Sequence, residues 1–159
     1  MNSLFEAESS RLSPPASVTL IWCDGACSGN PGVGGWGTIV EENGQRRELS
    51  GARPRTTNNQ MELQGLIEGL KSVAPGTRVE IVTDSEYVSK GVSSWMKSWI
   101  RNGWKTASKQ PVKNQEQWQE LNDLLQARPH KISWVRGHAG HAENERCDEL
   151  ARMAIKKIV

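Results

Sequence analysis

Two short apolar runs in this chain each end at an aspartate. Residues 18–23 lead into Asp24, and residues 79–83 lead into Asp84. Both runs are rich in β-branched side chains, which predicts strands. A carboxylate beside a buried strand is costly unless it is paired or binds a cation, because an unpaired charge loses its hydration. These two aspartates therefore constrain the fold and the kind of site together.

The hydrophobic periodicity predicts the element order β-β-β-α-β-α-α-β-α. Asn43-Gly44 indicates a hairpin between the second and third strands, and Thr56, Thr57 and Asn58 are candidate N-caps for the first helix. A break in the second helical region is expected at residues 102–103. The expected strands are 18–23, 36–40, 47–50, 79–83 and 132–135, and helical spacing covers 63–70, about 85–101, 114–126 and 147–158.

This order predicts an α/β fold with a mixed five-stranded sheet flanked by helices. Three strands joined by tight turns form an antiparallel meander, whereas strands separated by helices are parallel through right-handed crossovers. Sites in such sheets form outside the carboxyl ends of parallel strands, near a switch in strand order. If the first and fourth strands are neighbours, Asp24 and Asp84 are neighbours too.

Two further acids, Glu62 and Asp148, lie near the starts of predicted helices. Each of the four acids has an ordinary role when taken alone. Asp24 fits a tight turn and Asp84 a helix N-cap. Glu62 fits a solvated helix edge, and Asp148 a favourable place in a helix dipole. Together, at compatible ends of one architecture, they predict a site for hard divalent cations.

Zinc and cysteine chemistry are the alternatives to that site. His138, His141 and Cys147, with Cys23 and Cys27, offer zinc ligands. Structural zinc sites normally show ligands paired at short spacing, and we expect Cys23 and Cys27 to face different ways. A Cys–His nucleophile is also disfavoured, because Cys147 falls on an apolar helix stripe where a thiol is usually inert.

The segment between residues 87 and 115 contains no acid but is rich in basic and aromatic residues. A solvated helix face with tryptophans packed inward is one interpretation. A merely solubilising surface mixes both signs of charge, however, and basic residues beside aromatic ones suit phosphates and base faces. We therefore favour nucleic-acid binding. The residues are Lys90, Trp95, Lys97, Trp99, Arg101, Trp104, Lys105, Lys109 and Lys113.

Length and composition favour one domain. The chain has 159 residues, of which 36% are hydrophobic, enough for a sizeable core over residues 18–159. Residues 1–17 lack a signal-peptide pattern and are expected to form a flexible tail. No apolar run is long enough to span a bilayer. Three cysteines cannot all pair within the chain, which favours reduced thiols and a cytoplasmic location. We expect a monomer.

Several motifs, taken in order from about Val18 to the C-terminus, closely resemble ribonuclease H of the bacterial type 1 class. Further matching segments are 34–37, 83–88, 103–106, 111–114 and 144–148. The most specific motifs are Asp24-Gly25-Ala26-Cys27-Ser28-Gly29-Asn30-Pro31-Gly32, Thr56-Thr57-Asn58-Asn59-Gln60-Met61-Glu62-Leu63 and Val135-Arg136-Gly137-His138-Ala139-Gly140-His141.

The resemblance implies an endonuclease that uses Mg²⁺, or Mn²⁺ in its place, to cut the RNA strand of RNA–DNA hybrids. The implied catalytic residues are the metal-binding acids Asp24, Glu62, Asp84 and Asp148, together with the loop histidine His138. The implied substrate-binding residues are Arg55, Thr57 and Asn114 in a pocket for a DNA phosphate, the amides Asn30, Asn58 and Asn59, and a basic protrusion at about 95–113 with Trp95, Lys97, Trp99, Arg101, Trp104 and Lys105.

Two residues depart from the family pattern. Many relatives have Arg in place of Gln60 and Gln in place of Glu86, so this chain has less positive charge beside the expected hybrid groove. These departures leave the four acids intact, so activity is expected, with weaker hybrid binding or a shifted metal dependence as the consequence. Flanking glycines should let the His138 loop move, so that the imidazole can shuttle a proton or help to expel product. The alternative is a surface histidine that caps the last helix.

Two other functions remain open. The first is a nuclease of related fold, such as a junction resolvase or transposase core, against which the basic segment and Thr57-Asn58-Asn59 argue. The second is a non-catalytic hybrid-binding module, against which the presence of all four acids argues.

Overall fold

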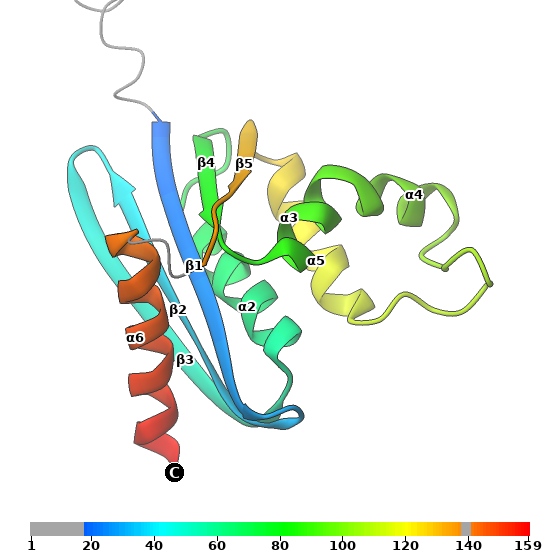
Figure 1. The fold of residues 1–159 in the computed structure, drawn as a ribbon. Helices are drawn as coiled ribbons and strands as arrows, with labels where there is room; N and C mark the ends of the chain where they lie inside the picture. Colours follow the sequence, from blue (N-terminus) through cyan, green and yellow to red (C-terminus); the bar gives the residue numbers. More distant parts are fainter. Residues whose placement is uncertain (1–17, 138–140) are drawn as a thin grey trace, which may run out of the picture.

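The computed structural model of the protein describes residues 18–137 and 141–159, so the predicted tail at 1–17 lies outside the described residues. Figure 1 shows the fold. The strands are β1 (Val18–Gly29), β2 (Gly32–Glu42), β3 (Gln45–Thr56), β4 (Arg78–Thr83) and β5 (His130–Trp134). The helical elements are α2 (Asn58–Lys71), α3 (Glu86–Lys90), the π-helical turn η2 (Gly91–Trp95), α4 (Met96–Arg101), α5 (Gln115–Gln126) and α6 (Ala142–Ile158).

The five strands form one mixed sheet in the order β3-β2-β1-β4-β5. β1 pairs with β2, and β2 with β3, in antiparallel fashion, whereas β1–β4 and β4–β5 are parallel. The predicted fold class, with three antiparallel strands followed by parallel ones, is therefore confirmed. Among the described helices, none combines the length and apolar character that crossing a membrane requires.

Helices cover both faces of this sheet (Figure 1). α6 packs on β1, β2 and β3, while α2 packs on β1 and β2 and also contacts α5. The main core lies on the α2 side, where Leu63, Leu66, Ile67 and Leu70 are fully buried, in agreement with the predicted helical spacing. Burying an apolar stripe of this kind is what stabilises a helix in a domain.

β1 is twice as long as predicted. The glycine-rich segment after residue 23, where a tight turn was the ordinary interpretation, continues as strand and pairs with β2 through Gly29↔Gly32. The chain reverses only at Asn30-Pro31. Backbone pairing does not require apolar side chains, so the hydrophobic pattern alone ends this strand too early. Asp24 consequently lies within β1 and not at its end.

The turn between β2 and β3 is the one that the sequence predicts. Asn43 and Gly44 have φ values of 53° and 77°. Positive φ at both central residues is the requirement of a two-residue hairpin whose twist matches its strands.

Glycines let both main helices approach the sheet closely. A Cβ at Gly25 would lie 2.5 Å from the backbone nitrogen of Glu62 in α2. A Cβ at Gly37 would lie 2.2 Å from the carbonyl oxygen of Cys147 in α6. Since real Cβ atoms do not approach other atoms this closely, a side chain at either position would push a helix away from the sheet.

The region predicted to be helical from about residue 85 consists of three short elements. α3 is followed by the π-helical turn η2 and then α4, which ends just before the expected break at 102–103. Gly91 opens η2 and lies against the buried Trp118 of α5, where a Cβ would come within 2.0 Å of the indole ring. The wider π-turn thus lies where a helix crosses a large aromatic side chain.

We expect Gly37→Ala to lower the free energy of unfolding by about 3 kcal/mol, the upper part of the range for overpacking, because a backbone carbonyl cannot rotate out of the way. Gly44→Ala is the control. Gly44 has positive φ but no atom within 4 Å of a Cβ, so only conformational strain of about 1 kcal/mol applies. Urea denaturation measures both. Equal losses would contradict the close approach of α6.

Candidate active site

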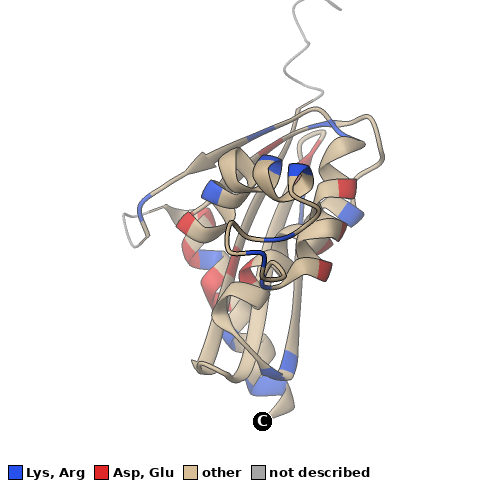
Figure 2. Cartoon of the chain, turned by 90° about the vertical axis from the view of Figure 1, so that its right-hand side faces the viewer, with Lys and Arg blue, Asp and Glu red and all other residues tan. Residues whose placement is uncertain are grey.

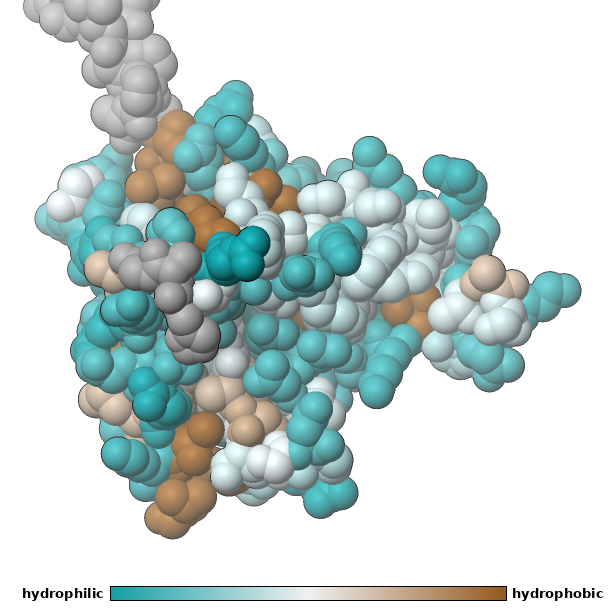
Figure 3. All heavy atoms as spheres, viewed as in Figure 1, coloured by the Kyte–Doolittle hydropathy of each residue, from teal (hydrophilic) through white to brown (hydrophobic). Residues whose placement is uncertain are grey.

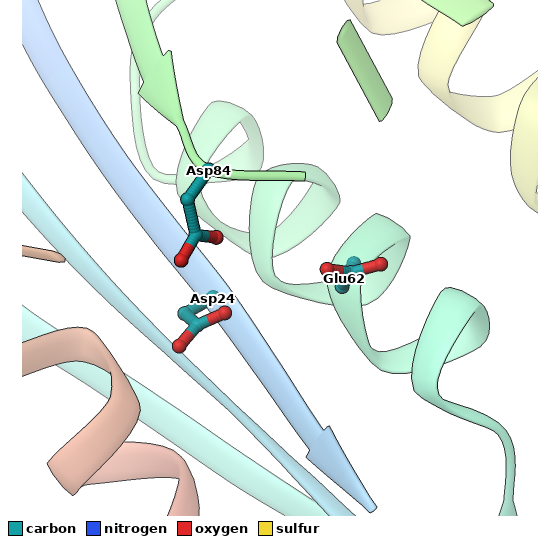
Figure 4. A group of neighbouring side chains, drawn as sticks. All are labelled: Asp24, Glu62 and Asp84. Carbon is teal, nitrogen blue, oxygen red and sulfur yellow. The ribbon is translucent and has the colours of Figure 1, made fainter. Parts of the chain in front are cut away.

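Three of the four predicted acids converge in one cluster. Carboxylate oxygens of Asp24, Glu62 and Asp84 all lie within 4.8 Å of one another. Figure 4 shows Asp24 on β1 and Asp84 just beyond β4 with their carboxyl groups facing each other, and Glu62 beside them on α2. We call these three residues the acidic cluster. All three side chains are partly buried.

The parallel pairing of β1 with β4 positions the two aspartates. The last paired residues are Cys23 and Thr83, so the next residue on each strand is an aspartate at the same end of the pairing. The Ser85 hydroxyl accepts a hydrogen bond from the backbone N–H of Val88 (3.1 Å) and caps α3. Ser85, and not Asp84, therefore caps this helix, and the Asp84 carboxylate remains in the cluster.

Asp148 lies nearby but outside the acidic cluster. Its Oδ2 is 2.8 Å from a guanidinium nitrogen of Arg152, one turn further along α6. It nevertheless lines the same hollow of about 560 Å³ as Asp24 and Asp84. The structure therefore brings the fourth acid to the edge of the site, where an ion pair on its own helix holds it.

The electrostatics of the acidic cluster favour neutral acids when no cation is bound. Burial is the largest cause that raises the pKa of Asp24 to about 8, followed by the charge of Asp84, while the Gly25 N–H at 2.9 Å opposes the shift. Burial likewise raises the pKa of Glu62 to about 7, with the Ser85 hydroxyl lowering it and Asp84 raising it. Desolvation and like charges both disfavour the ionised forms.

This donor set fits a hard divalent cation. Carboxylate oxygens are the preferred ligands of Mg²⁺ and Mn²⁺, and a bound cation would supply the positive charge that the buried acids lack. Asp24, Glu62 and Asp84 would hold it, with Asp148 within the same hollow.

The zinc and thiol alternatives gain no support from the described residues. The cluster that could hold a metal there contains carboxylates alone. Burial raises the pKa of Cys23, and that of Cys147 to about 12, so both thiols stay protonated. The expectation that Cys23 and Cys27 face different ways is wrong. Side chains alternate along β1, so residues four apart share a face.

The two histidines of the predicted loop differ in what the structure shows. His138 lies outside the described residues. His141 is the exposed N-cap residue of α6 and lines the hollow, but its side chain forms no capping hydrogen bond.

Several of the predicted substrate-binding residues meet at the start of α2. Thr57 is the N-cap of this helix. The Asn30 side chain, from the β1–β2 turn, accepts a hydrogen bond from the backbone N–H of Asn58 (3.2 Å). Asn59 follows in the first turn, and Arg55 is exposed on β3. These residues thus lie on one surface beside Glu62.

Asn114 joins this surface from the start of α5. Its side-chain oxygen accepts from Gln60 of α2 at 3.2 Å, and its side-chain nitrogen donates to the Tyr87 hydroxyl at 3.1 Å. Asn114 has a φ of 60°, and its side chain makes no capping hydrogen bond to α5.

The basic segment, residues 95–113, comprises the last residue of η2, α4 and the loop after it. In Figure 1 this part extends away from the sheet, and Figure 2 shows Lys and Arg positions spread over the helices and loops nearest the viewer. Lys97, Arg101 and Lys105 are exposed. In Figure 3 the visible face of the same arm is mostly pale and teal, with a small brown patch. One aliphatic side chain of α4, Ile100, is 47% exposed.

The three tryptophans of the basic segment are packed inward to different degrees. Trp99 and Trp104 are half-buried and pack against the core, with Trp99 5.2 Å from Trp118 between ring centroids. Trp95 is 37% exposed and stacks beside Trp99 at 6.0 Å. The tryptophans therefore build the arm, and Trp95 offers the most accessible ring of the three.

The sequence reasoning did not single out Arg136 and Arg152, which line the hollow with the acids. An arginine on a polar helix face has no distinctive pattern. The spacing of Asp148 and Arg152, four residues apart on one helix, was the available signal.

Comparisons with known proteins give the family of this chain. The RNase H family model matches residues 16–156. Ribonuclease H of Bradyrhizobium sp. (strain ORS 278) is 55% identical over 137 residues, which are 85% of this chain and 88% of that protein. Ribonuclease HI of Neisseria meningitidis serogroup B (strain ATCC BAA-335 / MC58) is 54% identical over 134 residues, covering 84% of this chain and 92% of that protein.

Solved structures show the same similarity. LC9-RNase H1, described as a type 1 RNase H with the type 2 active-site motif, has a TM-score of 0.80 and 34% identity over 89% of this chain and 74% of that one. LC11-RNase H1 in complex with an RNA/DNA hybrid has a TM-score of 0.66 and 25% identity, covering 88% of this chain and 98% of that one.

The sheet order, its flanking helices and the neighbouring carboxylates define an enzyme of the ribonuclease H-like fold. The chain belongs to the ribonuclease H family, within its bacterial type 1 class, ribonuclease HI.

The raised pKa values predict how stability depends on pH in the metal-free protein. The folded-state pKa values of Asp24 and Glu62, about 8 and about 7, lie above the ordinary 3.8 and 4.5. The folded protein therefore binds more protons than the unfolded chain in this window, so this contribution to stability is lost as pH rises from about 4 to 8. Asp24→Asn should make the loss smaller, and MgCl₂ should reverse it at pH 8.

Urea denaturation in EDTA at pH 5 and pH 8 measures this difference. Glu86→Gln, which removes an exposed acid on α3, is the control and should keep the wild-type pH dependence. A wild-type and an Asp24→Asn protein with equal pH slopes would contradict the burial of the Asp24 charge.

Proposed function

We propose that this ribonuclease H is an endonuclease that hydrolyses the RNA strand of RNA–DNA hybrids with Mg²⁺, or with Mn²⁺ in its place. The observation that carries the proposal is the acidic cluster, in which three carboxylates lie close together and burial raises the pKa of Asp24 and of Glu62. The hybrid bound by the related LC11-RNase H1 supports the substrate.

The chain's own residues would divide the work as follows. Asp24, Glu62 and Asp84, with Asp148 beside them, hold the cations. Two such ions would supply Lewis-acid chemistry there, which would lower the pKa of an attacking water and stabilise negative charge on the leaving 3′ oxygen. Products would carry 5′-phosphate and 3′-hydroxyl ends. His138 remains the predicted proton shuttle or product-releasing group.

The proposed hybrid surface runs from the start of α2 to the basic segment. Asn30, Asn58 and Asn59 lie beside Glu62 and would contact the hybrid near the cut strand, whose 2′-hydroxyls distinguish RNA from DNA. The basic segment would contact phosphates of the DNA strand. Substrate binding thereby places one strand over the acids and holds the other on the arm.

One departure from the family pattern is largely neutralised within α3. Glu86 lies 3.2 Å from Lys90 in an exposed pair four residues apart. The added negative charge is therefore compensated locally, although such exposed pairs contribute little to stability.

We also propose that the enzyme works as a monomer in the cytoplasm. Its cysteines are free thiols, which is the usual state of cysteines in the reducing cytoplasm.

A gel assay with end-labelled substrates and Mg²⁺ tests this function. We expect cleavage of the RNA strand of a hybrid and none of single-stranded RNA, duplex DNA or a DNA junction. Cleavage of the junction but not the hybrid would favour a resolvase. Binding of the hybrid without cleavage would favour a non-catalytic module.

Asp24→Asn or Asp84→Asn should abolish cleavage and leave hybrid binding largely intact, because a lost cation-holding charge affects the transition state more than substrate affinity. Turnover and the Kd for the hybrid, measured separately, check this. Near wild-type turnover in either variant would refute the proposed metal site.

Neutralising Lys97, Arg101 and Lys105 together, each to Gln, should raise KM, affect kcat less, and reduce the slope of log KM against log salt by about 3. Neutralising Lys131, Lys156 and Lys157 in the same way is the control, since these residues lie on β5 and at the end of α6. An unchanged slope would show that the basic segment does not touch the backbone phosphates.

A further inference from the structure

Gln60 connects Thr57 and Asn114, two residues that the family resemblance implies for a DNA-phosphate pocket. Its side-chain oxygen accepts from the Thr56 hydroxyl at 2.8 Å and from the Thr57 backbone N–H at 3.3 Å, and its side-chain nitrogen donates to Asn114 at 3.2 Å. Thr57 in turn accepts from the backbone N–H of Gln60, which completes a capping box at the start of α2. Gln60 therefore links the first turn of α2 to the first residue before α5.

Two groups that can only donate fix the orientation of both amides. The Thr57 backbone N–H requires the oxygen of Gln60, so the nitrogen of Gln60 must face Asn114. Asn114 must then present its oxygen to Gln60 and its nitrogen to the Tyr87 hydroxyl. At the far end, the indole N–H of Trp118 donates to the same hydroxyl at 2.8 Å. The chain of hydrogen bonds has one consistent direction.

Some hydrogen-bond donors of Gln60, Asn114 and Thr57 are not used within this network and are available to a ligand. An amide nitrogen carries two, and Gln60 and Asn114 each use one within the described network. The Thr57 hydroxyl accepts from Gln60 and keeps its own proton. Each of the three side chains thus has one donor without a partner among the described residues. Thr57 and Gln60 stand at the positive end of α2, which has 14 residues, and Asn114 directly precedes α5. A phosphate offers acceptors alone, so these leftover donors match it.

We propose that Gln60 is a positioning and binding residue of the DNA-phosphate pocket. It holds Asn114 so that an N–H is available and adds an uncharged N–H donor of its own. The inference rests on the proposed hybrid substrate but assigns a residue that the proposed function does not. Because Gln60 carries no charge, the pocket recognises the phosphate by directed hydrogen bonds and contributes less to the salt dependence than a guanidinium would.

Two variants test this role. Gln60→Glu keeps an acceptor for Thr56 and Thr57 but cannot donate to Asn114, and it adds a negative charge at the pocket. Gln60→Met is uncharged, of similar length, and loses every side-chain hydrogen bond. The control is Gln126→Glu, the same change at the far end of α5, where the exposed Gln126 side chain donates a hydrogen bond to Asn122 at 3.4 Å.

The measurement is the Kd for an RNA–DNA hybrid without divalent cation, compared with hybrids in which single DNA phosphates are replaced by methylphosphonates. For the wild type, one replacement should weaken binding by about tenfold. For Gln60→Glu the unmodified hybrid should already bind about tenfold more weakly, and the same replacement should cost nothing more. Gln60→Met should show a smaller loss, with the same insensitivity. Gln126→Glu should behave as the wild type.

Two results would overturn the proposal: an unchanged Kd in both Gln60 variants, or a methylphosphonate penalty that persists in them. A merely structural role would lower the melting temperature and weaken binding at every phosphate equally, and this too would overturn it. Failure of the wild type to cleave the hybrid when Mg²⁺ is added would count against the proposed function and not against Gln60.

Discussion

The parallel backbone pairing of β1 with β4 is the interaction on which the site depends. The register ends at Cys23 and Thr83, and the next residue on both strands is an aspartate. The two aspartate side chains need no attraction for each other to lie this close, because hydrogen bonds between the strands fix the distance between the two backbones. The hydrogen bonds between the strands thus hold two carboxyl groups together, although their charges repel each other when both ionise. The rest of the fold has to tolerate that repulsion.

The helices α2 and α6 complete the site by packing closely on the sheet at two glycines. Gly25 lets α2 lie close enough to bring Glu62 to the aspartates, and Gly37 lets α6 lie close enough to bring Asp148 to the same hollow. Burial then raises the pKa of Asp24 and of Glu62. The close packing that builds the core therefore also disfavours the ionised acids, and a bound cation would offset this effect.

Which features the sequence predicts depends on how far apart along the chain the interacting residues lie. Adjacent aspartates follow from strand ends and crossover rules, and the Asn43-Gly44 hairpin follows from local turn chemistry. The full length of β1 was missed because glycine-rich backbone can pair without an apolar pattern. The link from Gln60 to Asn114 joins residues 54 positions apart, and only the packing of α2 on α5 brings them together.

The approach of Gly91 to Trp118 has a consequence for how tolerance to mutation should be interpreted in this enzyme. No side chain fits at position 91 unless the indole moves, and that indole anchors the Tyr87 hydroxyl, which in turn holds Asn114. In a selection for activity, this glycine should be as intolerant as the acids, although it touches no reacting group. A screen that measures activity alone would therefore assign to the active site residues that only support the fold. Measuring protein abundance for the same variants would separate these residues from the ones that bind the substrate.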